Sequence, residues 1–135
     1  MSEVEKIRAV LDCFALGWRK ADAAILKGTW DKNFADSIYQ ASERETAVYG
    51  YDAIAEYYDE ATSMYPITSM EISNVRIQQH SDAALAYCDI AIGFRVGNSE
   101  YLVHPRASFL LKKQVNGEWL TQHYHESIKY EVPKS

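Results

Sequence analysis

Apolar residues near the start of the chain recur at intervals of three and four positions, which is the spacing of a helix with one buried face. The stripe comprises Val4, Ile7, Leu11, Phe14 and Trp18. Ser2 and Glu5 have the spacing of a capping box, so the first helix is expected to begin at Ser2. Asp22 is placed to cap a short second helix, which Gly28 would end.

A third helical pattern opens at Gly50 and Asp52 and stops before Pro66, because proline cannot continue a helix. Its apolar positions are Ile54, Tyr57, Tyr58, Ala61 and Tyr65. Between the second and third helices the pattern is irregular, and only residues 37–40 and 46–49 are strand-like.

The rest of the chain predicts strands. Runs rich in β-branched and aromatic residues cover 67–79, 83–96, 99–115 and 118–131. Helices first and a long meander last predict an α+β fold, in which a cone-shaped, curved antiparallel sheet wraps over three N-terminal helices. No linker, repeat or low-complexity segment interrupts residues 1–135, so we expect a single domain.

Two predicted turns give the strand register. Gly97-Asn98 and Asn116-Gly117 are placed as two-residue hairpin turns, so the numbers of facing residues would sum to 195 in the first hairpin and 233 in the second. The rungs of one face are then Ala84 with Leu111 and Gln122, Ala86 with Phe109 and Tyr124, Cys88 with Ala107 and Glu126, and Ile90 with Pro105. Because this face is mostly small and apolar, we expect it to cover the helices and leave room for a cavity.

The opposite face is more polar. Its rungs are Leu85 with Leu110 and His123, Tyr87 with Ser108 and His125, and Asp89 with Arg106 and Ser127. Asp89 and Arg106 form a complementary cross-strand pair in this register. The apolar members of this face predict that the protein forms a homodimer through it.

Composition and charge narrow the partners. The formal net charge is −5 and Lys and Arg are not clustered, which argues against nucleic acid. No apolar run approaches the ~18 residues of a membrane span, and the N-terminus lacks a signal pattern, so a cytoplasmic protein is expected. Cys13 and Cys88 are predicted to be buried thiols rather than a disulfide or metal pair, and no cofactor is expected.

Three segments carry a resemblance to a known family. They are Gly117-Glu118-Trp119-Leu120-Thr121-Gln122-His123-Tyr124-His125-Glu126-Ser127, Tyr49-Gly50-Tyr51-Asp52-Ala53-Ile54 and Ser81-Asp82-Ala83-Ala84-Leu85-Ala86-Tyr87. The first resembles the last strand of SnoaL-like proteins of the nuclear transport factor 2-like superfamily. It is especially similar to the association domain of calcium/calmodulin-dependent protein kinase II. The superfamily includes isomerases, dehydratases, cyclases and assembly domains, so the resemblance implies the fold and not one activity.

Several positions depart from these relatives. Where steroid isomerases of the superfamily carry a tyrosine and an aspartate, the resemblance places Phe14 and Phe109, and their general base would fall near Gln40 or Ala41. Isomerase chemistry by that route is therefore not expected. The arginines that line the pocket of the kinase association domain match Asp89, Leu110 and Glu126 approximately, so a preference for anions should not transfer.

Glu126 is the leading candidate for a catalytic residue, since a carboxyl group in an apolar cavity would have a raised pKa and could exchange protons near neutral pH. The alternative is that Arg95, Arg106 or a tyrosine neutralises it structurally. The predicted ligand-binding residues are Trp30, Tyr39, Tyr58, Cys88, Phe109, Gln122, Tyr124 and Glu126. The same aromatic residues could instead be ordinary core.

His123 and His125 share one strand face and could hold a metal, but a hydrogen-bonded pair at the sheet surface is the favoured interpretation, and no metal site is predicted. Asp36 precedes the first short strand and is interpreted as turn chemistry, with a pocket acid as the alternative. Three function classes remain open: a small-molecule-binding protein of unassigned activity, an acid–base enzyme of isomerase, dehydratase or cyclase type that uses Glu126 and a tyrosine, and an oligomeric association hub.

Overall fold

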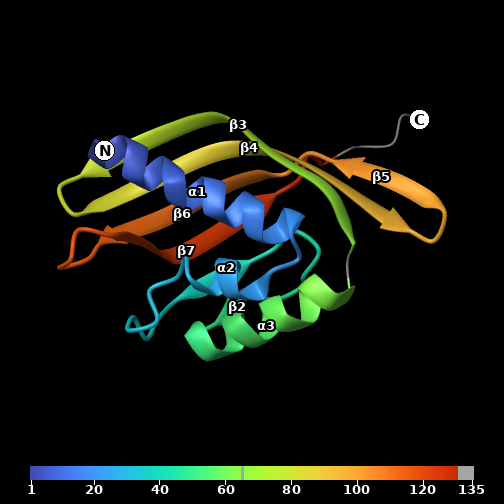
Figure 1. Cartoon of the computed structure of the whole chain (residues 1–135), viewed down its shortest axis with the longest axis horizontal. Coiled ribbons are helices and arrows are strands. Elements are labelled where there is room, and N and C mark those ends of the chain that lie inside the picture. Colours follow the sequence, from blue (N-terminus) through green and yellow to red (C-terminus); the bar gives the residue numbers. More distant parts are fainter. Residues whose placement is uncertain (65, 131–135) are drawn as a thin grey trace.

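The structure is a computed structural model, and it describes residues 1–64 and 66–130. Its elements, in chain order, are α1 (Glu3–Arg19), α2 (Ala23–Lys27), β1 (Ile38–Gln40), β2 (Val48–Tyr49), α3 (Tyr51–Met64), β3 (Ile67–His80), β4 (Ala83–Val96), β5 (Ser99–Val103), β6 (Arg106–Lys113) and β7 (Trp119–Ser127). Helix α1 lies across one face of the long strands, and α2 and α3 lie below it (Figure 1). The three helices followed by a sheet confirm the predicted α+β class.

Local signals set the helix ends. Ser2 Oγ accepts a hydrogen bond from Glu5 N at 3.1 Å, and Asp22 Oδ1 accepts one from Ala24 N at 3.0 Å, so both predicted caps are present. Val4 was expected on the buried stripe of α1 but is 50% exposed, because the first turn extends beyond the buried part of the stripe. Tyr65, expected at the end of α3, lies outside the described residues.

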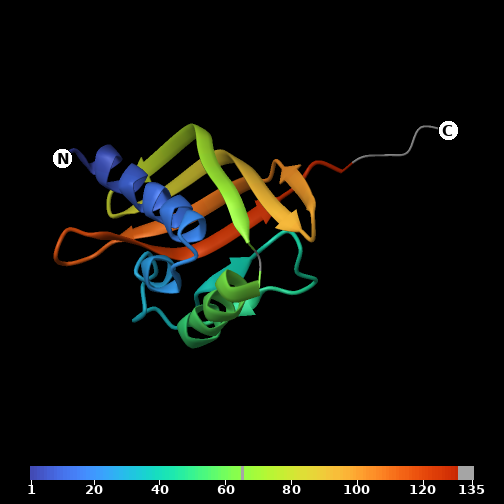
Figure 2. The same cartoon turned by 45° about the vertical axis from the view of Figure 1, so that its right-hand side comes forward.

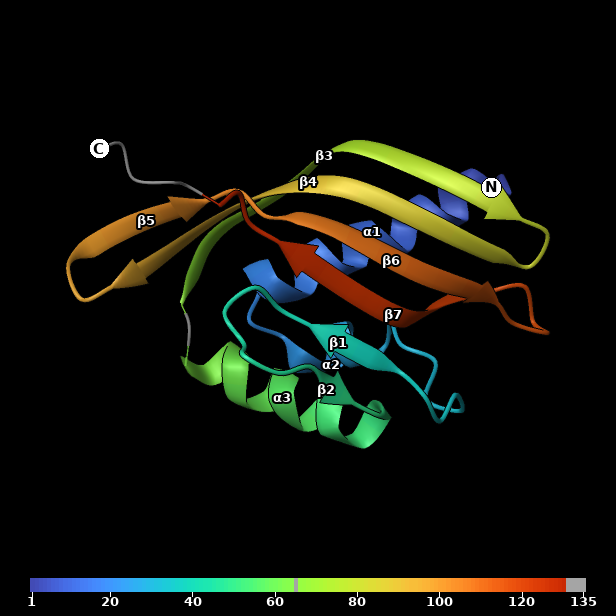
Figure 3. The ribbon, with the colours of Figure 1, turned by 180° about the vertical axis from the view of Figure 1, so that it is seen from behind.

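The sheet has the strand order β2-β1-β7-β6-β4-β3, with β5 paired to β4. It is mixed rather than wholly antiparallel, because β1 runs parallel to β7. The short strands of the irregular segment therefore form one end of the sheet, beside α3 (Figure 3). The β4–β5 hairpin projects from the sheet, away from α1 (Figure 2).

The predicted register holds between β4 and β6, where Ala86 pairs with Phe109 and Asp89 with Arg106. The prediction for the β6–β7 turn was wrong. Its loop has three residues, 115–117, so that Lys113 pairs with Trp119 and Gln114 N donates to Glu118 O at 2.6 Å. The register then shifts again between Leu110 and Leu111.

This second shift is a β-bulge at Gln122. Leu111 pairs with Thr121 and Leu110 with His123, so Gln122 has no rung, contrary to its predicted place opposite Leu111. Beyond the bulge the predicted pairs return, including Phe109 with Tyr124. The longer turn and the bulge each shift the register by one residue, in opposite directions. The rest of β7 therefore keeps its predicted faces.

The loop after α2 supports the bulge. Thr121 N donates to Thr29 O at 2.7 Å, and Asp31 N donates to Thr121 O at 3.0 Å. Asp31 Oδ2 also accepts hydrogen bonds from Gln122 Nε2 at 3.1 Å and Gln114 Nε2 at 3.2 Å. The buried Asp31 carboxylate therefore joins the bulge to the end of β6.

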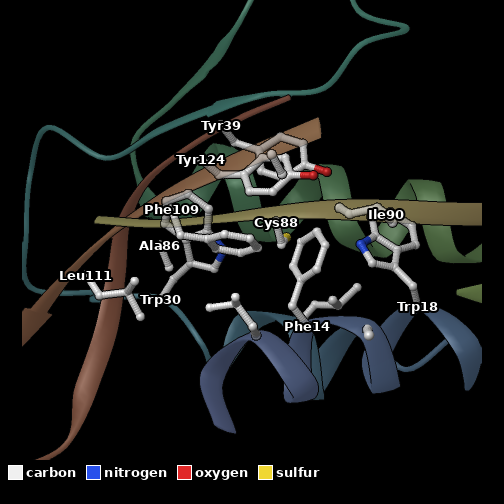
Figure 4. Packing of buried hydrophobic residues seen from close by; sticks show 14 of the residues in the cluster. Phe14, Trp18, Trp30, Tyr39, Ala86, Cys88, Ile90, Phe109, Leu111 and Tyr124 are labelled. Atoms are coloured by element: carbon white, nitrogen blue, oxygen red, sulfur yellow. The ribbon is translucent and has the colours of Figure 1, made fainter. Parts of the chain in front are cut away.

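The inner face of the long strands is buried against α1. Phe14 of α1 packs on Phe109 and Tyr124, with ring centroids 5.2 and 5.0 Å apart, as Figure 4 shows. On the outer face Leu85 and Tyr87 are 44% and 40% exposed, which agrees with the predicted partition of the faces. Over the part of the chain that the structure describes, no helix covers this outer face (Figure 3).

The two cysteines have different environments. Cys88 is fully buried, as predicted, but Cys13 is exposed because it lies on the solvent side of α1. Burial raises the pKa of the Cys88 thiol to about 12. Among the residues described, no helix has both the length and the apolarity to cross a membrane.

Candidate functional site

A cavity of about 320 Å³ lies between the end of α1, the adjoining part of the sheet and the loop after β1. Its aromatic lining residues are Phe14, Trp18, Tyr39, Tyr57, Phe94 and Tyr124. Its other apolar lining residues are Ile67, Met70, Ile92, Val103, Pro105 and Ile128. Its polar lining residues are Ser42, Glu43 and Glu126.

The cavity does not lie beside the small residues of the inner face, where the sequence predicted it. Ala84, Ala86 and Ala107 are covered by other core side chains and do not line it. The space instead lies near the last turn of α1, where Arg19 Nη1 donates to Met70 O on β3 at 2.9 Å.

Glu126 lies in the wall of this cavity. It stands two residues after Tyr124 on β7, so both side chains point to the inner side of the sheet. Its Oε1 accepts a hydrogen bond from Tyr124 Oη, and its Oε2 accepts one from Ser42 Oγ, each at 2.7 Å. Burial raises the pKa of Glu126, although these two hydrogen bonds act in the opposite direction.

Two stacked tyrosines adjoin this carboxyl group. The rings of Tyr39 and Tyr124 are 4.9 Å apart and 13° from parallel, and their hydroxyl oxygens lie side by side in Figure 4. The parallel pairing of β1 with β7 produces the stack, because it places Tyr39 directly beside Tyr124. Burial raises the pKa of both phenols well above the ordinary value, so both remain proton donors at neutral pH.

A second carboxylate lies at the rim. Glu43 is exposed, and its Oε1 accepts a hydrogen bond from Tyr57 Oη at 2.8 Å. Burial, followed by the negative charge of Glu43, raises the pKa of Tyr57. Arg44 lies with Cζ 5.3 Å from the centroid of the Tyr57 ring and does not line the cavity.

The structure brings together three of the predicted ligand-binding residues, Tyr39, Tyr124 and Glu126. Trp30, Tyr58, Cys88 and Phe109 are buried in the core and do not line the cavity, and Trp30 Nε1 donates to Tyr58 Oη at 2.8 Å. Gln122 holds the bulge instead of facing the cavity.

Sequence reasoning missed the other twelve lining residues, which include Ser42, Glu43 and Tyr57. Ser42 and Glu43 follow a three-residue strand in an irregular segment, where periodicity gives no orientation. Tyr57 was predicted on the third helix, but only the packing shows that it turns toward the cavity.

The remaining candidates lie elsewhere. Asp36 is exposed in the turn before β1 and does not line the cavity. His123 is partly buried, and this burial, with the charge of His125, lowers the pKa of its imidazole. Within residues 1–64 and 66–130, no three His, Cys, Asp or Glu side chains are grouped closely enough to hold a metal.

The profile of the SnoaL-like domain matches residues 7–131, which is nearly the whole chain. The chain belongs to the SnoaL-like family. None of the curated proteins matches it in sequence.

Solved structures resemble this SnoaL-like domain closely in fold. A provisionally named dehydratase of the NTF2-like family from Streptomyces avermitilis has a TM-score of 0.82 at 14% identity, over 96% of this chain and 97% of that chain. A provisionally named calcium/calmodulin-dependent protein kinase II association domain from Xanthomonas campestris has a TM-score of 0.81 at 16% identity, over 98% and 91%. A ketosteroid isomerase-like protein from Erwinia carotovora atroseptica has a TM-score of 0.76 at 22% identity, over 96% and 98%. At these identities the likeness establishes the fold.

The positions that depart from the steroid isomerases have apolar or structural roles here. Phe14 lines the cavity with a ring that has no hydroxyl group, and Phe109 is buried in the core. Gln40 donates through Nε2 to Ala41 O at 2.8 Å and Arg44 O at 3.0 Å, so its amide supports the loop that carries Ser42 and Glu43.

Proposed function

We propose that this SnoaL-like protein binds a small molecule with a mostly apolar body in the cavity that Glu126 adjoins. The cavity itself is the observation that supports this most directly, because about 320 Å³ of space is lined by twelve apolar or aromatic residues and three polar ones. A pocket of this size and composition is typical of small-ligand sites. Glu126, Ser42 and the two stacked tyrosine hydroxyls would orient the ligand.

Filling the cavity tests this proposal. Ile92→Trp places a larger side chain in the lining, while Leu85→Met changes the exposed outer face and serves as the control. A screen of small metabolites by thermal shift should find compounds that stabilise the wild type and the control but not Ile92→Trp. A compound that stabilises all three proteins equally binds elsewhere, and a screen in which every hit does so would refute the proposal.

Acid–base catalysis is a second candidate, and the environment of Glu126 favours it. A carboxyl group with a raised pKa can take a proton from one position of a bound molecule and return it to another. Each carboxylate oxygen keeps a second lone pair after its bond to Ser42 or Tyr124, so a substrate proton can still be accepted. Tyr39 would donate a hydrogen bond to the oxygen on which charge develops, because the hydroxyl hydrogen of Tyr124 is already donated to Glu126.

The two functions are distinguished by Glu126→Gln. An enzyme should lose turnover of a hit compound while still binding it, and the wild-type rate should follow the protonation of one carboxyl group. If the wild type binds a hit compound but does not convert it, the acid–base proposal is wrong and the binding function stands.

The homodimer also stays a proposal, and the exposed apolar residues of the outer face support it. Leu85 and Tyr87 lie there at 44% and 40% exposure. Sedimentation should give twice the 15.4 kDa chain mass, and Tyr87→Lys should shift the protein toward monomer. A ring of many subunits would favour the association hub instead, and a wild-type monomer would refute both.

A further inference from the structure

The charged residues that line the cavity are all acidic. Of its fifteen lining residues, two are carboxylic, Glu43 and Glu126, and none is Lys, Arg or His. An anionic ligand would meet two carboxyl groups with no cation to compensate it. A neutral ligand would leave the negative charge of the site unbalanced.

The hydrogen-bond partners of both carboxyl groups are neutral. Ser42 and Tyr124 donate hydroxyl hydrogens to Glu126, and Tyr57 donates one to Glu43. A hydroxyl group stabilises a carboxylate but carries no charge to cancel it. Among the described residues, the ion pairs involve Glu3, Asp59 and Asp82 and leave out both cavity carboxyl groups.

Basic residues on segments that adjoin the cavity do not line it. Arg44 donates through Nε to Thr46 O at 3.2 Å while its guanidinium covers the Tyr57 ring. His104, Arg106 and Lys129 line a separate polar cleft that also contains Asp89. None of these four basic residues lines the cavity.

The aromatic residues that line the cavity would also attract a cation. The negative face of an aromatic ring attracts a cation placed within about 6 Å, and tyrosine and tryptophan are among the better rings for this contact. Trp18, Tyr39, Tyr57 and Tyr124 all line the cavity. Carboxylates beside aromatic rings suit a positively charged group attached to an apolar body.

We propose that the ligand of this cavity is an organic cation, an amine whose ammonium group lies between Glu43 and Glu126 and whose apolar body fills the aromatic part of the cavity. This inference rests on the proposed binding function and narrows it to one chemical class. It also gives a role to Glu43, which would neutralise the ammonium at the rim together with Glu126.

Binding should depend on pH in a defined direction. Glu43 contributes to the raised pKa of Glu126 through like-charge repulsion, after the larger effect of burial. A bound ammonium group favours the ionised form of Glu126, so binding releases a proton when the free carboxyl group is protonated. The affinity should therefore increase as the pH rises through the pKa of Glu126, as long as the amine stays protonated.

Three probes with one phenyl group test the charge: 2-phenylethylamine, 2-phenylethanol and phenylacetate, titrated by calorimetry or chemical-shift perturbation at pH 7.5 and low salt. The amine should bind at least about tenfold more tightly than the alcohol, and phenylacetate should bind most weakly. Glu126→Gln and Glu43→Gln should each reduce the preference for the amine. Glu45→Gln should preserve it, because Glu45 is exposed on the same loop and does not line the cavity.

The outcomes separate this inference from the proposed function. If the alcohol or phenylacetate binds as tightly as the amine, and Ile92→Trp abolishes that binding, the cavity binds small molecules but the cation inference is wrong. If the amine preference survives both glutamine variants, the cation binds elsewhere and the inference is also wrong. If none of the three probes binds at millimolar concentration, both the inference and the binding of molecules of this size are refuted.

Discussion

Removing the Tyr124 hydroxyl group should destabilise the protein by an amount that depends on pH. Tyr124 is fully buried, and its Oη lies 2.7 Å from Glu126 Oε1. Tyr124→Phe keeps the ring and its stack with Tyr39 and removes only this donor. The loss therefore reports the hydrogen bond to the carboxyl group.

The size of the loss follows from the charge of Glu126. A hydrogen bond to a charged group contributes roughly 1.5–3 kcal/mol, and one between neutral groups roughly 0.5–1.5 kcal/mol. At pH 8, which favours the ionised form of Glu126 more than pH 4 does, we expect Tyr124→Phe to lose about 2 kcal/mol of unfolding free energy. At pH 4, below the raised pKa of Glu126, we expect a loss of about 1 kcal/mol. At about 3 °C per kcal/mol for a chain of this size, the melting temperature should fall by about 6 and 3 °C.

Urea unfolding of both proteins at the two pH values measures these differences. Tyr58→Phe is the matched control, because it also removes a buried tyrosine hydroxyl group, but one that accepts a hydrogen bond from Trp30 Nε1 at 2.8 Å. Its loss should be the same at both pH values. An equal loss for Tyr124→Phe at pH 4 and pH 8, or a larger loss at pH 4, would refute the reasoning about Glu126.

Three further variants or treatments have expected outcomes. Burial raises the pKa of Glu126 in the folded protein, so the protonated carboxyl group stabilises the fold at low pH and this stabilisation is lost as the pH rises through the folded pKa. In thermal melts, Glu126→Gln should therefore become more stable relative to the wild type as the pH is raised from 4 to 8. Gly17→Ala should cost roughly 1–3 kcal/mol in urea unfolding, because its Cβ would lie 2.7 Å from Leu26 Cγ; a cost near zero would show that α1 and α2 adjust freely. A thiol reagent at pH 8 should label the exposed Cys13 within minutes and spare Cys88, as mass spectrometry would show; equal labelling would mean that the inner face opens readily.

Local signals predicted most of the secondary structure, because the forces that end helices act within a few residues. Ser2 and Asp22 cap α1 and α2 as expected, and Gly50, which has a φ of 85°, precedes α3. The pairing of β4 with β6 was also predictable, because the Gly97-Asn98 turn is tight and Val96 pairs with Ser99.

Turn length and strand pairing between distant segments were not predictable in the same way. Asn116-Gly117 suits both two-residue and three-residue loops, and the difference depends on how Gln114 and Glu118 bond across the turn. The parallel pairing of β1 with β7 joins segments far apart in the chain, and no local pattern encodes it. The site shares this limit: Glu126 could be proposed from an unusual carboxylate on an apolar face, whereas Ser42 reaches it only through the tertiary fold.

The three-residue turn and the bulge at Gln122 are the two places where this hairpin can lose a residue. A two-residue loop can still close the pair of Gln114 with Glu118, so deleting one loop residue leaves the later pairs of β7 in place. Deleting Gln122 removes the one residue without a rung, so Thr121 and His123 keep their partners and Tyr124 still faces inward. Both shortenings are therefore expected to keep the two faces of β7, and a redesigned hairpin could have a regular last strand without moving the pocket residues.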